Sequence, residues 1–463
     1  MKNISKKIVL GLLTAAAIAP AAGQELRTSY FMQTSNFRHQ MNPALLDSAY
    51  FSIPFLGNIN FGTTGNIGLA DFVFPLSGST EYTHTTFMSP TVSADEFLSG
   101  LHDKNRADIY YNWNIFSVGF RAFGGVNLVE MNLRSNTNIS LPYELFEFAK
   151  TAGAKEQYDL SDIGVRSQNY MEVALGHTRA INDKLTVGAK LKLLFGLAYA
   201  DFSVDQLNLT MNGDQWRIQG NAQLKMAALN SSFSYETEDK NSDDGRQRVD
   251  GLDDTTFGMP GFGLAFDFGA TYKLTEDLTL SAGLTDLGFI SWSNVLAASS
   301  MGDYTFDGFD NIYTGGTDDG TNKLGDQFDA LGDDLEDMFA VYDDGKTSHS
   351  QALAATLNIG AEYTLPVYRP LRFGFLYTSR ISGIYSYHQA MLSANVRPLK
   401  WVEASLNTAV SSTGWTLGAM LSLKAKHFNI YLASDRFLGK VSSEFIPLHN
   451  LNSSINFGMT IPL

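Results

Sequence analysis

The sequence predicts an all-β fold, a transmembrane antiparallel β-barrel of the outer-membrane type with about 16 strands. Three observations favour this fold. Apolar and polar residues alternate in many segments, short turns alternate with long loops, and the chain starts with an export signal. A strand that crosses a membrane needs one face for lipid and one for a lumen, and a period of two supplies both. A secreted soluble β-sandwich is the alternative.

The alternation is clearest in the hairpin of residues 169–203. One parity is apolar and comprises Met171, Val173, Leu175, Leu185, Val187, Ala189, Leu191 and Leu193. The opposite parity carries Glu172, Lys190 and Lys192. If lipid covers the apolar face, these three residues face the lumen, where they are candidates for a charged pore or a contact with a plug. An ordinary salt bridge inside the lumen is the alternative interpretation.

The first 23 residues predict a cleaved signal peptide. Lysines precede an apolar run over residues 8–18, and small residues at 21–23 form a cleavage site before Gln24. No cysteine follows, which excludes a lipoprotein anchor, and no later segment has the roughly 20 apolar residues of a membrane helix. We therefore expect an exported protein that resides in the bacterial outer membrane.

The segment after the signal differs from the rest of the chain. Residues 24–50 have no clear period, and Pro43 can start a short helical turn there. We separate residues 24–50 from residues 51–463, which we assign to the barrel; the family resemblance given below implies that residues 24–50 are a plug-like segment. Within the barrel region, Ser93 predicts a capped helix over residues 94–101. A second helix is predicted at residues 142–152.

The connections between strands predict a barrel with two different ends. Tight turns are expected at residues 124–125, 182–184, 212–214 and 275–277, and long loops at 80–105, 142–168, 236–260 and 293–350. Outer-membrane barrels have short periplasmic turns and long external loops. With both termini in the periplasm, about 16 strands follow, or 14 if residues 185–211 form one long strand and another short run is not separate. Tryptophans 216, 292, 401 and 415 lie near predicted strand ends, where an interfacial girdle is expected.

Composition excludes several classes of function. The formal net charge is -15, which argues against a nucleic-acid partner, since phosphates require a basic face. No nucleophile elbow or metalloprotease motif is present, the eight histidines are dispersed, and there is no cysteine. We therefore predict no catalytic residues, no cofactor and no metal centre, and not an enzyme. The acidic insertion of residues 303–344 could bind divalent cations weakly and bridge to lipopolysaccharide; a solvated acidic loop is the alternative.

Three short motifs resemble a known family. They are Asn42-Pro43-Ala44, the run 261–272 followed by 280–284 and 287–292, and the strand of residues 190–198. Together they resemble FadL/PorV-like outer-membrane barrels, especially an uncharacterised Bacteroidetes-type family. In the FadL branch the Asn-Pro-Ala region belongs to an N-terminal plug, so the resemblance implies that residues 24–50 occupy the lumen. No ligand motif of the family is matched.

The sequence leaves three functions open, and the resemblance implies the first two. The first is passive uptake of hydrophobic or amphipathic small molecules, as in the FadL branch. The second is a non-transport barrel that anchors or shuttles a partner in a secretion or envelope-assembly complex, as PorV-like members do. The third is an enzyme at the barrel rim. One barrel fold can serve several of these functions. The expected partners are outer-membrane lipid and lipopolysaccharide, with a hydrophobic ligand or an envelope complex depending on the function.

Overall fold

The structure is a computed structural model, and it describes residues 25–76, 84–151, 154–212, 215–228, 231–242, 244–253, 258–300, 303–306, 340–437 and 452–463. The predicted signal peptide lies outside the described residues. So do residues 307–339, which include most of the acidic insertion.

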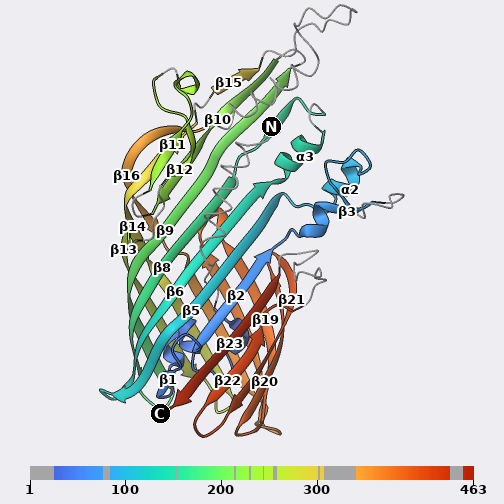
Figure 1. The fold of residues 1–463 in the computed structure, drawn as a ribbon. Coiled ribbons are helices and arrows are strands. Elements are labelled where there is room, and N and C mark those ends of the chain that lie inside the picture. Colours follow the sequence, from blue (N-terminus) through green and yellow to red (C-terminus); the bar gives the residue numbers. More distant parts are fainter. Residues whose placement is uncertain are drawn as a thin grey trace, which may run out of the picture.

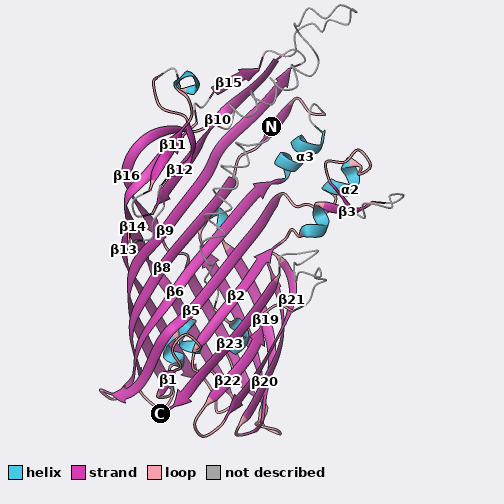
Figure 2. Cartoon of the chain, viewed as in Figure 1, coloured by secondary structure: helices cyan, strands magenta, loops and turns pink. Residues whose placement is uncertain are grey.

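The described strands close into one antiparallel barrel of 14 strands (Figures 1 and 2). In order around the wall they are β1 (Tyr50–Ser52) with β2 (Asn58–Gly65), β5 (Lys104–Ala122), β6 (Gly125–Pro142), β8 (Ile163–Ala180), β9 (Leu185–Asn212), β10 (Gln215–Ala227) with β13 (Gly261–Lys273), β14 (Leu278–Ser299) with β15 (Asp303–Phe306), β16 (Tyr342–Ala352) with β17 (Ala355–Thr364), β18 (Leu371–Ile381), β19 (Tyr387–Leu399), β20 (Val402–Ser411), β21 (Gly414–Lys424), β22 (Asn429–Ser434) and β23 (Ser453–Pro462). Strand β23 pairs with β1 and β2 and thereby closes the barrel. The predicted fold class is confirmed.

The strand number is the lower of the two predicted values, because β9 is a single strand of 28 residues. Its first part pairs with β13, from Leu185 to Gly196, and its second part pairs with β10, from Tyr199 to Asn212. Strands β10 and β13 therefore share one place in the wall. Between them in the chain lies the small hairpin of β11 (Ser232–Tyr235) and β12 (Val249–Asp253).

The two ends of the barrel differ, as predicted, but β9 and β10 meet at the external end, so the tight turn predicted at residues 212–214 is not at the same end as the other three. At one end the strands join through short turns, and the C-terminus lies at this turn end (Figure 1). At the other end, strands β5 to β10 rise far above the shorter strands β18 to β23 (Figure 1). None of the helices in the described parts of the chain is long and apolar enough to cross a membrane.

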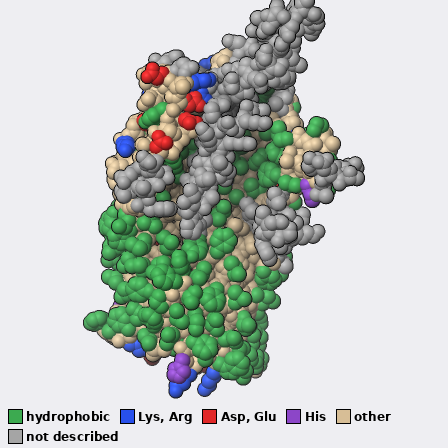
Figure 3. Space-filling model, viewed as in Figure 1, with side chains coloured by type: hydrophobic (Ala, Val, Ile, Leu, Met, Phe, Trp, Pro, Cys, Tyr) green, Lys and Arg blue, Asp and Glu red, His purple; other side chains and the backbone are tan. Residues whose placement is uncertain are grey.

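The outer surface of the wall is apolar over a continuous belt (Figure 3). Strand β13 shows the pattern: its residues alternate between buried and exposed, and Phe262, Leu264, Phe266 and Phe268 are exposed outward. Such residues need an apolar solvent, and lipid supplies it. The opposite parity is buried and mostly polar, with many Asn, Ser and Thr side chains.

The prediction of a tryptophan girdle is correct for only two of its four residues. Trp401 and Trp415 are 54% and 56% exposed and lie at opposite ends of the β20–β21 hairpin. Trp292 instead faces the interior and is only 1% exposed. Trp216 is half-buried against an apolar cluster beyond the belt. The prediction was wrong for these two because a strand end places a residue near an interface only when its parity also points outward.

Several predicted loops are partly strands that continue beyond the belt. Residues 293–299 extend β14, Tyr342 begins β16, and Val249–Asp253 forms β12 inside the loop predicted at 236–260. In this external extension the inner face is apolar, as at Leu207 and Leu209 of β9. The outer face is polar because water covers it, which reverses the parity pattern expected from the belt.

Small helices cover the external extension. Helix α2 (Ala94–Leu98) is capped by Ser93, whose hydroxyl accepts a hydrogen bond from Glu96 N at 3.1 Å, but it is shorter than predicted. Helix α3 (Tyr143–Thr151) matches its predicted range closely. Phe97 and Phe146 join the two helices in an aromatic cluster with strands β3 (Val73–Pro75) and β4 (His84–Thr86) nearby. Strand β7 (Gln157–Asp159) pairs with β9, and the remaining 3-10 turns are η4 (Leu69–Asp71), η5 (Glu238–Lys240) and η6 (Gly383–Tyr385).

Candidate functional site

Residues 25–46 lie inside the barrel, and their side chains and backbone contact inward-facing groups from many strands (Figure 2). They form only three isolated 3-10 turns, η1 (Arg27–Ser29), η2 (Arg38–Gln40) and η3 (Pro43–Leu45). Such a segment cannot satisfy its own backbone groups, so partners must come from elsewhere. We call this stretch the N-terminal segment.

Side chains of the wall supply these partners. Thr28 N donates to Asp435 Oδ1 at 2.8 Å, and Thr34 N donates to Glu403 Oε2 at 2.8 Å. Arg372 Nη1 donates to the Phe31 carbonyl at 3.0 Å. The groups come from β18, β20 and the end of β22, so the N-terminal segment is fixed to several sides of the lumen at once.

A row of glycines forms the seat of the N-terminal segment. The row, here called the glycine seam, comprises Gly188 of β9, Gly269 of β13, Gly283 of β14, Gly360 of β17 and Gly374 of β18. These strands are consecutive neighbours in the wall. A Cβ on Gly188 would lie 2.5 Å from the Pro43 carbonyl carbon, and one on Gly374 would lie 2.3 Å from the Phe31 ring. Only glycine lets the segment approach the wall this closely.

The Asn42-Pro43-Ala44 motif lies on this seam. Asn42 Oδ1 accepts a hydrogen bond from Ala44 N at 3.0 Å and caps the turn that Pro43 begins, as the sequence predicts. The Asn42 amide donates to the Ala270 carbonyl at 3.3 Å, and Thr178 Oγ1 donates to the Pro43 carbonyl at 2.6 Å. The motif thus connects a local turn to the wall.

An ion-pair layer lies next to the N-terminal segment, and it contains all three charged residues singled out in the sequence. Glu172, Lys190 and Lys192 are 0%, 4% and 1% exposed. Lys192 Nζ lies 2.8 Å from Asp267 Oδ2, 2.7 Å from Asp286 Oδ1 and 3.6 Å from Glu172 Oε2. Lys190 Nζ pairs separately with Glu130 at 2.7 Å. Buried charges of this kind are tolerated only when they are paired and hydrogen-bonded.

Arg134 connects this layer to the N-terminal segment. Its Nε lies 2.9 Å from Glu172 Oε2, and its Nη1 lies 2.7 Å from Glu25 Oε1. Asn112 Nδ2 donates to the other oxygen of Glu25 at 3.1 Å. The charged groups of the hairpin therefore contact the start of the N-terminal segment through one arginine.

The sequence reasoning missed Arg134, Asp267 and Asp286. A signal for Asp267 was available, because it is the single charged residue in the Phe266-Asp267-Phe268 alternation and so marks the inward parity. Asp286 had no such signal. It adopts φ +59°, and the pairing of β13 with β14 shifts register between Phe266 and Phe268, so strand parity does not predict its direction.

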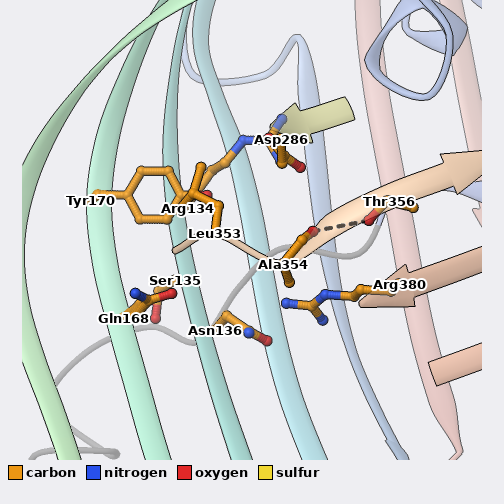
Figure 4. Close-up of a pocket in the computed structure, with 10 residues that line it drawn as sticks. All are labelled: Arg134, Ser135, Asn136, Gln168, Tyr170, Asp286, Leu353, Ala354, Thr356 and Arg380. Carbon is orange, nitrogen blue, oxygen red and sulfur yellow. Dashed lines mark hydrogen bonds between the residues drawn. The ribbon is translucent and has the colours of Figure 1, made fainter. Parts of the chain in front are cut away.

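A cavity opens beside this layer (Figure 4). Its lining comprises Arg134, Ser135, Asn136, Gln168, Tyr170, Asp286, Leu353, Ala354, Thr356 and Arg380. It contains about 390 Å³ of atom-free space, including its open mouth. Arginine and amide side chains provide hydrogen-bond donors, and Leu353, Ala354 and the Tyr170 ring provide apolar surface among them (Figure 4).

The cavity lies where strand pairing in the wall is interrupted. Strand β14 pairs with β17 up to Thr285–Thr356 and resumes with β16 at Phe289–Ala352. Between these points, Leu353 and Ala354 connect β16 to β17, opposite the irregular residue Asp286. On the outer surface of β14, Leu287 and Phe289 are exposed to the lipid side. The Leu353 N–H still donates a hydrogen bond to the Gly288 carbonyl at 2.9 Å, so the backbone stays joined across this irregularity.

An aromatic layer lies on the external side of the cavity. It includes Tyr170, Tyr199 and Trp292, and the rings of Tyr199 and Trp292 stack with centroids 5.3 Å apart. The chemistry of the whole arrangement suits binding and orientation of a molecule with a polar and an apolar part. Over the described ranges, no group of three or more histidines and carboxylates is arranged to hold a metal ion.

Comparison with solved structures gives barrels at low identity. The chain is similar to the toluene transporter TbuX of Ralstonia pickettii (TM-score 0.42, 12% identity, 91% of each chain covered). It is similar to the toluene transporter TodX of P. putida (TM-score 0.40, 11% identity, 91% of this chain and 92% of that chain). It is also similar to a Pseudomonas aeruginosa FadL homologue (TM-score 0.37, 11% identity, 91% of each chain).

A search of curated proteins gave no match. The profile described as "Family of unknown function (DUF5723)" matches residues 43–435, which is most of the chain and includes the Pro43 turn, the ion-pair layer and the cavity. The chain therefore belongs to the DUF5723 family.

Proposed function

We propose that the chain is a bacterial outer-membrane barrel through which small amphipathic molecules are taken up passively. The observation that carries this proposal is the position of the cavity at the wall break. A molecule in the cavity can direct its polar end to Arg134 and Gln168, and its apolar end to Leu353 and Ala354. From there the bilayer is the next apolar environment.

The lining of the lumen favours amphipathic over purely apolar molecules. The inward parity is largely polar, and a purely apolar solute would have to displace hydrogen-bonded groups without replacing their bonds. An amphipathic solute loses less hydrogen-bonding free energy, because its polar part can accept hydrogen bonds from arginine and amide donors. An anionic headgroup fits the donors best, since charge-assisted hydrogen bonds are stronger than neutral ones.

The position of the N-terminal segment determines which exit from the cavity is open. Its seat on the glycine seam lies on the turn side of the cavity, and its contacts with Glu403 and Asp435 reach across the lumen. We infer that it acts as a plug that closes the straight route to the periplasm. The break at Leu353 and Ala354 then offers the shorter exit, sideways into the membrane.

The test is uptake of 8-anilinonaphthalene-1-sulfonate, an amphipathic dye that intact lipopolysaccharide excludes. Cells that produce the chain should take up the dye faster than cells without it. Ala354→Trp fills the cavity and should return uptake to the background rate. Ile359→Trp is the matched control, because it adds the same bulk to β17 on the outward, lipid-facing side and should leave uptake unchanged. If both variants show the heat-modifiable gel mobility of a folded barrel and take up the dye at the same rate, the proposal is wrong.

A second candidate is a non-transport barrel that anchors or shuttles a partner of an envelope complex. The observation that favours it is the filling of the lumen by the N-terminal segment, together with the large external extension of β8, β9 and β10. Affinity isolation of the native protein distinguishes the two. A stoichiometric partner that persists when Ala354→Trp is introduced would favour this second function over uptake.

A further inference from the structure

The turn end of the barrel carries a concentrated basic surface on two adjacent turns. We call it the basic rim, and it comprises Arg397, Lys400, Lys424, Lys426 and His427. The turns connect β19 to β20 and β21 to β22, and Lys424 N donates to the Trp401 carbonyl at 2.8 Å, so they lie side by side. Figure 3 shows basic side chains and a histidine below the apolar belt at this end.

This surface contrasts with the chain as a whole, whose formal net charge is -15. The turn segments 397–401 and 424–428 contain no acidic residue. Within the described ranges, no carboxylate lies within 4.0 Å of the ammonium groups of Lys400, Lys424 or Lys426. By comparison, Arg369 on a neighbouring turn pairs with Asp277 at 3.1 Å. The described residues therefore leave the lysine charges of the basic rim without an ion-pair partner.

The basic rim is continuous with the lipid-facing belt. Leu399, Trp401 and Phe428 are 51%, 54% and 42% exposed among the basic groups. Strands β20 and β21 have 10 and 11 residues, which is about the length that crosses the hydrocarbon core at the usual tilt. Trp401 therefore lies at one membrane interface and Trp415 at the other, with the lysines at headgroup depth beside Trp401.

We propose that the basic rim binds the headgroups of anionic phospholipids in the leaflet next to the turn end. Lysine and arginine side chains near a membrane surface attract anionic lipid, and the adjacent tryptophan and phenylalanine rings contact the acyl chains of the same lipid. A phosphatidylglycerol molecule carries both features. This inference is independent of the cavity and of the uptake proposal, since the basic rim lies on the outside of the opposite end of the wall.

Trp401 and Trp415 allow the test and its control to be made in the same molecule, because each reports on lipid at a different end of the β20–β21 hairpin. The full chain is reconstituted in phosphatidylcholine vesicles that contain brominated phosphatidylglycerol or, at the same mole fraction, brominated phosphatidylcholine. The quenching lost in Trp401→Phe reports lipid at the basic rim, and the quenching lost in Trp415→Phe reports lipid at the uncharged turn of residues 411–414. Both residues face lipid, so neither replacement disturbs the core.

The expected result is a preference for phosphatidylglycerol of about fivefold at Trp401, the factor that one lysine near an anionic surface supplies. The preference at Trp401 should vanish in 0.5 M salt and in the combined variant Lys400→Gln, Lys424→Gln and Lys426→Gln. At Trp415 we expect no preference for either lipid. Equal quenching by the two lipids at Trp401, or a preference that survives the lysine replacements, would overturn the proposal. Native mass spectrometry of the detergent-released protein gives a second readout, because phosphatidylglycerol should remain bound to the natural chain and not to the lysine variant.

Discussion

The glycine seam makes a quantitative prediction about the N-terminal segment. In Gly188→Ala the new methyl group would lie 2.5 Å, 2.6 Å and 2.7 Å from three backbone atoms of Pro43 and Ala44. Ordinary contact begins at 3.4 Å, so the segment must move by about 1 Å. The movement strains the bonds from Thr178 to Pro43 and from Asn358 to Met41, at about 1 kcal/mol each.

Overpacking adds roughly 1–3 kcal/mol to this cost. The sum, about 3–5 kcal/mol, corresponds to a shift of at least roughly 100-fold from the seated to the unseated segment. The assay is maleimide labelling of Ser35→Cys, because the chain has no cysteine and Ser35 is 2% exposed in the segment. We expect labelling of the folded barrel to rise by that factor.

Gly176→Ala is the control for this experiment. Its Cβ would contact only wall side chains, Leu128 and Lys190, each at 3.2 Å, and not the N-terminal segment. Both variants must retain heat-modifiable gel mobility, which shows that the barrel is closed. If the cysteine introduced by Ser35→Cys is labelled at the same rate in Gly188→Ala and in Gly176→Ala, the glycine seam does not hold the segment and the reasoning is refuted.

Three further substitutions test the packing, and Lys104→Met is the control for the first of them. Arg134→Met leaves the Glu25 and Glu172 carboxylates without their arginine and should lower the free energy of unfolding by about 3–5 kcal/mol in guanidinium titrations. Lys104→Met, which removes an exposed pair, should cost under about 1 kcal/mol, and equal losses would contradict the account. Asn42→Ala removes the cap and the bond to Ala270, so maleimide labelling in the Ser35→Cys background should rise roughly tenfold, and unchanged labelling would count against a capping role. Phe97→Ala should expose residues 84–103 to chymotrypsin while the barrel midpoint stays constant, because the aromatic cluster packs outside the belt; a lower midpoint would disprove that separation.

The wall of the barrel is the part that the sequence predicts best. Alternation has a local cause, since successive side chains point to opposite faces, and it placed Leu191 outward and Lys192 inward in the hairpin. Local chemistry also predicted the Pro43 turn and the Ser93 cap, because each depends on a few neighbouring residues.

The interior depends on contacts between distant residues, and these had no local signal. The glycine seam aligns five strands under one segment, which single-strand patterns cannot show. Asp286 points inward only because of a left-handed backbone conformation beside a register shift. Beyond the belt, water replaces lipid at the outer face of the strands, so the polar face no longer marks the lumen. The outer parts of β14 and β16 were therefore predicted as loop.

The most direct test of the proposed uptake route is to locate the bound molecule. A dodecanoate analogue with a diazirine on its acyl chain is irradiated with the full chain in native outer membranes, and cross-linked residues are mapped by mass spectrometry. The account predicts modification at Leu353, Ala354 and Tyr170, and its loss in Ala354→Trp. Cross-links confined to the outward residues of β17 and β18, equal in the natural chain and in Ala354→Trp, would show ordinary lipid contact and contradict the route through the cavity.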